Sequence, residues 1–307
     1  MELSIVTTMY LSAAHLVDFY ERITPAAKQI TDDYEVIFVN DGSPDESLDV
    51  ALGLLEHDQR VRIVDLSRNY GHHKAMMTGL ASSRGELVFL IDGDLEEEPE
   101  LLGTFYRELR KSGTDTDVAY GVQKTRKGGY FERVSGALFY KAFNLLSTYP
   151  IPNNVVTARL MTRRYVDALV QHRDREVFIA GLWAITGFKQ IAVLINKHSR
   201  GKSSYNLSRK ISVFVNSLTS FSVKPLAFIF YLGCIIVLAS TIGAAVLIIR
   251  KLFFNVLLAG WPSLIVSIWL LGGLTIFCLG VVGIYVAKIF TESKERPYTV
   301  VRRIYGQ

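Results

Sequence analysis

The chain has 307 residues, of which half are hydrophobic, and it carries a net charge of +5 and a mean hydropathy of +0.24. This length accommodates one sizeable α/β domain and an appendage, and the positive hydropathy argues against a purely soluble enzyme. Lysine and arginine residues gather at 194–224 and 288–303, on either side of apolar segments, which favours an anionic membrane surface over nucleic acid as the partner of this charge.

Residues 1–122 alternate between strand-like and helix-like patterns. Apolar runs rich in Val, Ile, Leu and Phe predict strands at Leu3–Val6, Glu35–Asn40, Val61–Leu66, Glu86–Asp92 and Val118–Val122. The segments between them predict helices at Ala13–Ile30, Asp45–Leu55, Gly71–Ser83 and Glu98–Lys111. This alternation predicts a parallel sheet with helices on both faces, a fold that binds ligands at the carboxyl ends of its strands.

Residues 123–160 break this pattern. Gln123–Tyr130 is basic and contains glycine, which predicts a mobile loop. Phe131–Leu146 has aromatic and aliphatic residues at helical spacing with basic residues between them. This segment is either a core helix or a helix that lies on a bilayer, because the helical period alone does not distinguish the two.

Two long apolar runs follow, Pro225–Ile249 and Pro262–Ala287. Each exceeds the ~20 residues that a helix needs to cross a bilayer. The flanks outside this pair are far more basic than the short loop between the runs, so the positive-inside rule places the loop outside and both termini in the cytoplasm. No signal peptide is evident at the N-terminus. Cys234 and Cys278 lie inside the runs and are expected to be small hydrophobic residues, not a disulfide.

Two carboxylates follow the fourth predicted strand, where Phe89–Ile91 leads into Asp92, Gly93 and Asp94. Carboxylates at the end of a buried strand are costly unless something pairs with them, and Mg²⁺ or Mn²⁺ prefers oxygen ligands and bridges to phosphates. The pattern predicts a metal site that would neutralise a leaving diphosphate. The alternative is an acidic turn before the helix that begins near Pro99.

Asp41 follows the second predicted strand, where its carboxylate could accept hydrogen bonds from a nucleobase. Ser43–Asp45 is more typical of an ordinary turn in which Asp45 caps the next helix. His72 and His73 are expected on the surface, and Trp183 in the core. No G-x-G-x-x-G motif follows a strand, which argues against a nicotinamide or flavin cofactor.

Together these motifs resemble those of the family 2 inverting glycosyltransferases, which have the GT-A fold. The resemblance is carried by Leu66–Gly71 and by Ile91–Leu95 with the following Glu97, Pro99 and Glu100. Gly201–Tyr205 and Ser217–Leu226 resemble the juxtamembrane region of the polyisoprenyl-phosphate branch, which includes dolichol-phosphate mannose synthase and the bactoprenol glucosyltransferases. The two apolar runs match the layout of the bactoprenol enzymes.

The resemblance implies a Rossmann-like GT-A nucleotide-sugar domain with a mostly parallel sheet, followed by two transmembrane helices. It places Mg²⁺ or Mn²⁺ on Asp92 and Asp94, with Glu96 as a further ligand. The usual Pro-x-Tyr-Asn-Glu of the first strand aligns with Thr8–Ser12, where only Tyr10 remains. The implied nucleotide-sugar site comprises Thr8, Tyr10, Ser12, Asp41, Arg68, Lys74, Asp92 and Gly93.

A second departure concerns the catalytic groups. Many relatives carry an Asp, a candidate general base, where this chain has Thr157. A phosphate monoester has a second pKa near ~6 and is already an anionic nucleophile at neutral pH, so a base adds little. The implied catalytic residues are Asp94, Thr157 and Arg159. The acceptor phosphate needs cationic partners, for which the candidates are Arg126, Arg133, Arg159, Arg200 and Lys202.

We therefore expect an inverting transferase that moves a hexose or modified sugar from a nucleotide sugar to a polyisoprenyl phosphate, for the assembly or modification of cell-surface glycans. Its expected partners are these two substrates and the inner (cytoplasmic) membrane, with a homo-oligomer left open. The expected parts are a cytoplasmic enzyme domain at 1–224, an anchor at 225–290 and a cytoplasmic tail at 291–307. The alternatives are a non-catalytic membrane scaffold and a processive polysaccharide synthase, whose Gln-x-x-Arg-Trp motif is not found.

Overall fold

The computed structural model describes residues 1–123, 152, 154–196, 219, 222–254 and 260–306. The chain divides into two units, and 296–306 belong to the first unit together with the N-terminal part. Residues 222–254 and 260–295 belong to the second. The tail expected at 291–307 therefore contributes most of its described residues to the first unit.

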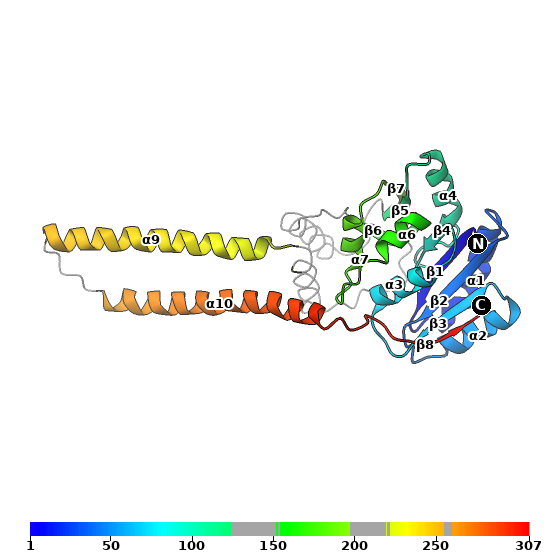
Figure 1. Ribbon diagram of the computed structural model, residues 1–307, viewed down its shortest axis with the longest axis horizontal. Coiled ribbons are helices and arrows are strands. Elements are labelled where there is room, and N and C mark those ends of the chain that lie inside the picture. The colour runs from blue at the N-terminus through cyan, green and yellow to red at the C-terminus, as the bar shows by residue number, and fades with distance from the viewer. Residues whose placement is uncertain (124–151, 153, 197–218, 220–221, 255–259, 307) are drawn as a thin grey trace. The chain divides into compact units, whose positions relative to one another are not determined.

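The first unit is built on an eight-stranded sheet with the strand order β7-β5-β6-β4-β1-β2-β3-β8 (Figure 1). Strands β1 to β4 are mutually parallel, as are β5 and β7, whereas β6 and β8 run antiparallel to their neighbours. This arrangement confirms the expected α/β fold with a mostly parallel sheet. The strands are β1 (Leu3–Met9), β2 (Tyr34–Asn40), β3 (Val61–Leu66), β4 (Leu87–Leu90), β5 (Val118–Gln123), β6 (Val155–Thr162), β7 (Gln190–Ile195) and β8 (Val301–Tyr305).

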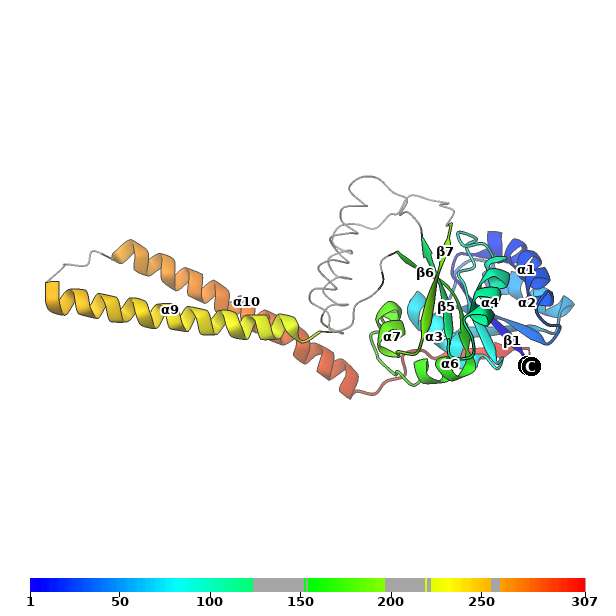
Figure 2. The same ribbon diagram turned by 90° about the horizontal axis from the view of Figure 1, so that it is seen from above.

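Helices cover both faces of the sheet (Figure 2). One face carries α1 (Ala13–Lys28), α2 (Ser47–His57) and α4 (Leu101–Lys111), and the other carries α3 (His72–Ser82) and α6 (Arg163–Leu169). Edge-to-face aromatic pairs join helices to strands, with ring centroids 6.1 Å apart for Phe19 and Phe38 and 6.0 Å for Phe89 and Phe105. The short helix α7 (Ile179–Ile185) precedes β7.

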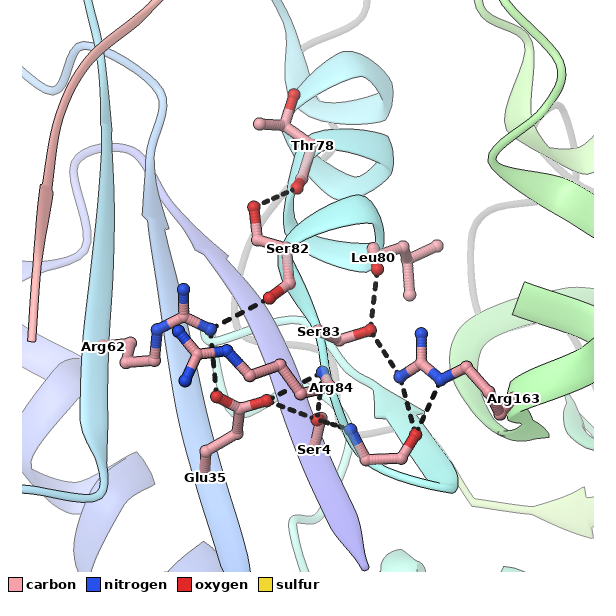
Figure 3. Close-up of polar contacts among 10 residues, drawn as sticks. Ser4, Glu35, Arg62, Thr78, Leu80, Ser82, Ser83, Arg84 and Arg163 are labelled. Carbon is pink, nitrogen blue, oxygen red and sulfur yellow. Dashed lines mark hydrogen bonds and ion pairs between the residues drawn. The ribbon is translucent and has the colours of Figure 1, made fainter. Parts of the chain in front are cut away.

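A buried polar cluster closes the amino-terminal end of the sheet (Figure 3). The Glu35 carboxylate pairs with the Arg62 guanidinium at 3.0 Å and accepts hydrogen bonds from the Ser4 hydroxyl and the Arg84 backbone N–H. Arg163 donates to the Gly85 carbonyl. These contacts tie together the starts of β1, β2, β3 and β4, and they lie at the opposite end of the strands from the motifs that predict chemistry.

The second unit contains two long helices, α9 (Lys224–Phe254) and α10 (Trp261–Ser293), which contact each other. Both are long and apolar enough to cross a membrane, by length and composition. They contain the two predicted apolar runs and extend beyond them. Cys234 and Cys278 lie in these helices and are not joined in a disulfide.

Candidate active site

Three loops meet at the carboxyl-terminal end of the sheet, because β1 lies between β2 and β4. The loop after β1 contains Tyr10 and Ser12, the loop after β2 begins at Asp41, and the loop after β4 contains Asp92 and Asp94. Ligands of such sheets bind at this end of the strands. The motifs singled out in the sequence are thus brought to one edge.

Asp41 organises the loop that follows β3. Its side chain is buried, and its two carboxylate oxygens accept hydrogen bonds from the backbone N–H groups of Tyr70 at 2.7 Å and Gly71 at 3.0 Å. Burial raises the pKa of Asp41, and the two backbone hydrogen bonds only partly offset this effect. Gly71 has a φ of +98°, a conformation that favours glycine. The loops after β2 and β3 therefore form one hydrogen-bonded unit, and base binding by Asp41 stays a prediction.

His72 links the loop after β4 to strand β1. Its Nδ1 lies 2.9 Å from the Thr8 hydroxyl, and its Nε2 lies 3.1 Å from the Asp92 carboxylate. Burial lowers the pKa of His72, but the hydrogen bond and charge of Asp92, with the charges of Asp94 and Asp41, outweigh it and raise the pKa. The sequence placed this histidine on the surface. Its side chain is indeed 47% exposed, but it bridges two expected site residues.

The loop after β4 is fixed by its own carboxylates. Asp94 is exposed, and its Oδ1 accepts a hydrogen bond from the Glu96 backbone N–H at 2.9 Å. Glu97 is fully buried and accepts the backbone N–H groups of Thr157 at 3.2 Å and Ala158 at 2.7 Å. Glu97 thus clamps this loop to β6 and brings Thr157 beside the acidic motif. Sequence reasoning gave Glu97 no role of its own.

The acidic loop offers few protein ligands for a metal. The described residues contain no group of three His, Cys, Asp or Glu side chains that could hold an ion, so Asp92, Asp94 and Glu96 do not form a set of three ligands. Mg²⁺ is commonly held by one or two carboxylates together with substrate phosphates. Asp92 and Asp94 fit a cation of that kind, whereas the expected ligation by Glu96 has no support from the geometry.

A second polar network joins the loops after β1 and β2. The Ser43 hydroxyl accepts the Leu11 backbone N–H at 2.8 Å, and the Asp45 carboxylate accepts the Ala13 backbone N–H at 3.2 Å. Asp45 also accepts hydrogen bonds from the Ser43 and Ser47 hydroxyls. Ser12 and Tyr10 belong to this loop, and the Tyr10 ring is exposed. The turn at Ser43–Asp45 therefore holds the segment in which the family's first-strand motif is altered.

Arg159 lies inside the protein. It is 1% exposed, its guanidinium stacks over the Trp183 ring, and it donates hydrogen bonds to the carbonyls of Val156 and Thr157. Burial lowers the pKa of Arg159 to about 9. The Arg159 guanidinium is thus covered in this structure, and its binding of an acceptor phosphate stays a prediction. The arginine packs Trp183 against β6.

The sequence comparison identifies the family. The model of glycosyl transferase family 2 matches residues 4–170. The chain belongs to glycosyl transferase family 2. A relative from Mycobacterium tuberculosis, described as putative glycosyltransferases, is 54% identical over 306 residues, covering 100% of this chain and 89% of that protein. The bactoprenol glucosyl transferase of Shigella phage SfV is 30% identical over 304 residues and covers 98% of both chains.

A solved structure shows the same fold. Glucosyl-3-phosphoglycerate synthase from M. tuberculosis, in complex with Mn²⁺, UDP and phosphoglyceric acid, aligns with a TM-score of 0.50 and 17% identity. The alignment covers 71% of this chain and 78% of that chain. The chain is therefore a GT-A-like glycosyltransferase with two apolar helices appended.

The remaining expected site residues of this family 2 enzyme are placed as follows. Arg68 is exposed, its guanidinium lies 4.1 Å from the centroid of the Tyr70 ring, and it donates to the Asn69 carbonyl. Lys74 lies in the first turn of α3, and Gly93 packs beside Thr7. The structure does not describe the four other cationic candidates for the acceptor phosphate. Apart from residue 123, it also does not describe the loop and helix expected at 123–146. The candidates are Arg126, Arg133, Arg200 and Lys202.

Proposed function

We propose that this family 2 glycosyltransferase transfers a sugar from a nucleotide-sugar donor to a polyisoprenyl phosphate, with inversion at the anomeric carbon. The observation that carries the proposal is the match to the bactoprenol glucosyl transferase of phage SfV along 98% of both chains. This match extends through the two apolar helices as well as the sugar-transfer domain. A lipid acceptor gives the two helices a function, since they would hold the active site at the membrane and raise the effective concentration of the head group.

The donor site would lie over the hydrogen-bonded unit of Asp41 and residues 67–71. This unit presents a backbone turn, and Tyr10 and Arg68 lie exposed near the same edge of the sheet. His72 would hold Asp92 in place through its contacts with Thr8 and the Asp92 carboxylate. Asp92 and Asp94 would hold Mg²⁺ or Mn²⁺, and this cation would neutralise the charge of the donor's diphosphate.

The transfer would be a single displacement. An oxygen of the lipid phosphate forms a bond to the anomeric carbon while the bond from that carbon to the diphosphate oxygen breaks, and the nucleoside diphosphate leaves with the electron pair. The attacking oxygen is already anionic near neutral pH. This chemistry is compatible with Thr157 at the position where relatives carry an acid. The role of Thr157 would be to line the acceptor side of the acidic loop, to which its backbone is bound.

The enzyme would be a multi-pass protein of the inner membrane, with the catalytic domain and both termini in the cytoplasm. The unequal distribution of basic residues around the apolar helices supports this orientation. The lipid-linked product would then serve the assembly or modification of lipopolysaccharide or another cell-wall glycan.

The proposal is tested with membranes that contain the protein, labelled nucleotide sugars and undecaprenyl phosphate. We expect a label that moves into the organic phase as a lipid monophosphate sugar with inverted anomeric configuration. Cleavage of the donor without a lipid product would point to another acceptor, and a long polymer would point to a polysaccharide synthase. Folded protein that neither binds nor cleaves any donor would contradict the proposal and favour a non-catalytic scaffold.

A further inference from the structure

The C-terminal strand β8 lies along the edge of the catalytic sheet, antiparallel to β3 (Figure 1). The residues just before it also contact this domain. The Val300 carbonyl accepts the Ser67 backbone N–H at 2.9 Å, and the Thr299 hydroxyl lies 2.8 Å from that of Thr78 on α3. Residues 299–305 are therefore fastened to β3, to the start of the loop that follows it and to the next helix.

Arg302 makes two contacts from this strand. Its guanidinium donates a hydrogen bond to the Ser67 carbonyl at 2.8 Å and lies 3.4 Å from the Asp65 carboxylate. Asp65 is 1% exposed, whereas the Arg302 side chain is 57% exposed. A buried carboxylate requires a charge partner or hydrogen bonds to be tolerated. Arg302 supplies positive charge to Asp65 from the solvent side.

Both contacts of Arg302 lead to the loops around Asp41. The other Asp65 oxygen accepts a hydrogen bond from the Asn40 side-chain Nδ2 at 2.8 Å, and the Asn40 side-chain Oδ1 accepts the Ser43 backbone N–H at 3.0 Å. Through Asp65 and Asn40, Arg302 is thus connected to the turn after β2. The second route passes through Ser67 into residues 67–71, whose backbone donates two hydrogen bonds to Asp41.

We propose that Arg302 is a positioning residue for donor binding, which holds the loops after β2 and β3 in the arrangement that receives the nucleotide. This inference rests on the proposed function, since it assumes that the nucleotide binds over Asp41. Arg302 does not itself contact the donor in this assignment. It acts through Asp65 and Ser67.

The test compares Arg302→Gln with Arg303→Gln in the full-length protein in membranes. Arg303 is the neighbouring arginine of β8, and its guanidinium lies 4.8 Å from the centroid of the Tyr305 ring. Both variants lose one positive charge from the same strand. We expect Arg302→Gln to raise the KM for the nucleotide sugar roughly three- to tenfold, with kcat changed less than about twofold, because a charged hydrogen bond that shapes the free site is lost. Arg303→Gln should behave like the wild type, and Arg302→Lys should recover part of the loss.

A second measurement does not depend on sugar transfer. Hydrogen exchange of peptides that cover residues 67–71 should be faster in Arg302→Gln than in Arg303→Gln. If the wild type turned over no donor, the proposed function would fail. The difference in hydrogen exchange between the two variants would still show whether Arg302 positions residues 67–71. Equal KM and equal exchange in the two variants would overturn the role of Arg302.

Loss of folding is addressed by a double variant. If Arg302→Gln fails to fold because Asp65 is left buried without its charge partner, adding Asp65→Asn should restore folding, since the Asn oxygen can still accept from Asn40. The KM and exchange measurements are then made on the double variant, which retains neither charge. If the double variant also fails to fold, Arg302 is needed for the fold as a whole, and the specific positioning role is rejected.

Discussion

Asp94 lies exposed on the loop after β4, so its carboxylate contributes little to packing. We expect Asp94→Asn to leave the melting temperature unchanged, because an Asn oxygen can still accept the Glu96 N–H. Sugar transfer should fall on the order of 100-fold, since the cation that would balance the diphosphate charge loses one of its two carboxylate ligands. Radiolabelled transfer to lipid measures the loss. The control is Glu108→Gln on α4, where the carboxylate is partly exposed and pairs with Lys111.

Removal of divalent metal from the wild-type enzyme tests the same metal assignment. Chelation by EDTA should abolish transfer by the wild type, and either Mg²⁺ or Mn²⁺ should restore it. Full turnover by Asp94→Asn, or by the chelated wild type, would remove the metal assignment at this loop.

Asp45 gives a prediction about acid stability. Burial alone would raise its pKa, but hydrogen bonds from the Ser43 and Ser47 hydroxyls and from backbone N–H groups, including that of Ala13, lower it from 3.8 to about 2. The folded state therefore prefers the ionised carboxylate more than the unfolded state does. This stabilisation is present above pH 3.8 and is lost as the pH falls towards 2.

We accordingly expect the melting temperature of the wild type to fall more steeply between pH 4 and pH 2 than that of Asp45→Asn, whose side chain does not titrate. Thermal unfolding at a series of pH values makes the comparison. Parallel curves for the two proteins would show that Asp45 does not link the loops as described.

The position of site residues along the chain could be predicted, but their contacts could not. Asp41, Asp92 and Asp94 stand where buried strands end, and parallel strands bring such ends to one edge. The bridge from His72 to Asp92 needs the register between α3 and β4, which no local pattern gives. The burial of Arg159 was missed because arginine is almost never fully buried. The stack on Trp183, which is distant in sequence, accommodates it together with hydrogen bonds to the Val156 and Thr157 carbonyls.

At the scale of elements, Glu97 joins the acidic loop to β6. Its carboxylate accepts two backbone N–H groups in a fully buried place. In Glu97→Gln the amide nitrogen cannot accept, so one N–H is left without its partner at a cost of about 1–3 kcal/mol. We expect lower stability by urea unfolding and slower transfer, whereas Glu56→Gln on the exposed face of α2 should change neither. Unchanged stability and unchanged transfer in Glu97→Gln would show that β6 does not need the Glu97 hydrogen bonds to keep its position.

The strands of the first half were predictable because they are buried on both faces and appear as continuous apolar runs. Val61–Leu66 was predicted with its observed ends, and the other four predicted strands differ at their ends. The strands that were missed are antiparallel or peripheral. β6 contains Arg159 and two threonines, and β8 is an edge strand with two arginines. Neither sequence therefore has the continuous apolar run by which a central strand is predicted.

At the scale of the whole molecule, the proposed orientation in the membrane can be tested with single cysteines. Gly260 lies exposed at the start of α10 and is replaced by Cys in a background where Cys234 and Cys278 are Ala. A membrane-impermeant maleimide should label it in intact cells, because the less basic loop is expected outside. Glu2→Cys should be labelled only after lysis. The reverse pattern would overturn the proposed orientation.

The place of β8 in the chain has a consequence for how the protein is made. This strand follows both apolar helices, so a ribosome delivers Arg302 only after both helices have been synthesised. The other strands can pair earlier, since domains form from the N-terminus during synthesis. The loop at residues 67–71 would therefore acquire its contact with Arg302 only after both helices have been made. A soluble enzyme cut before α9 would lack this contact, and residues 296–306 would have to be supplied as a fused tail or a separate peptide.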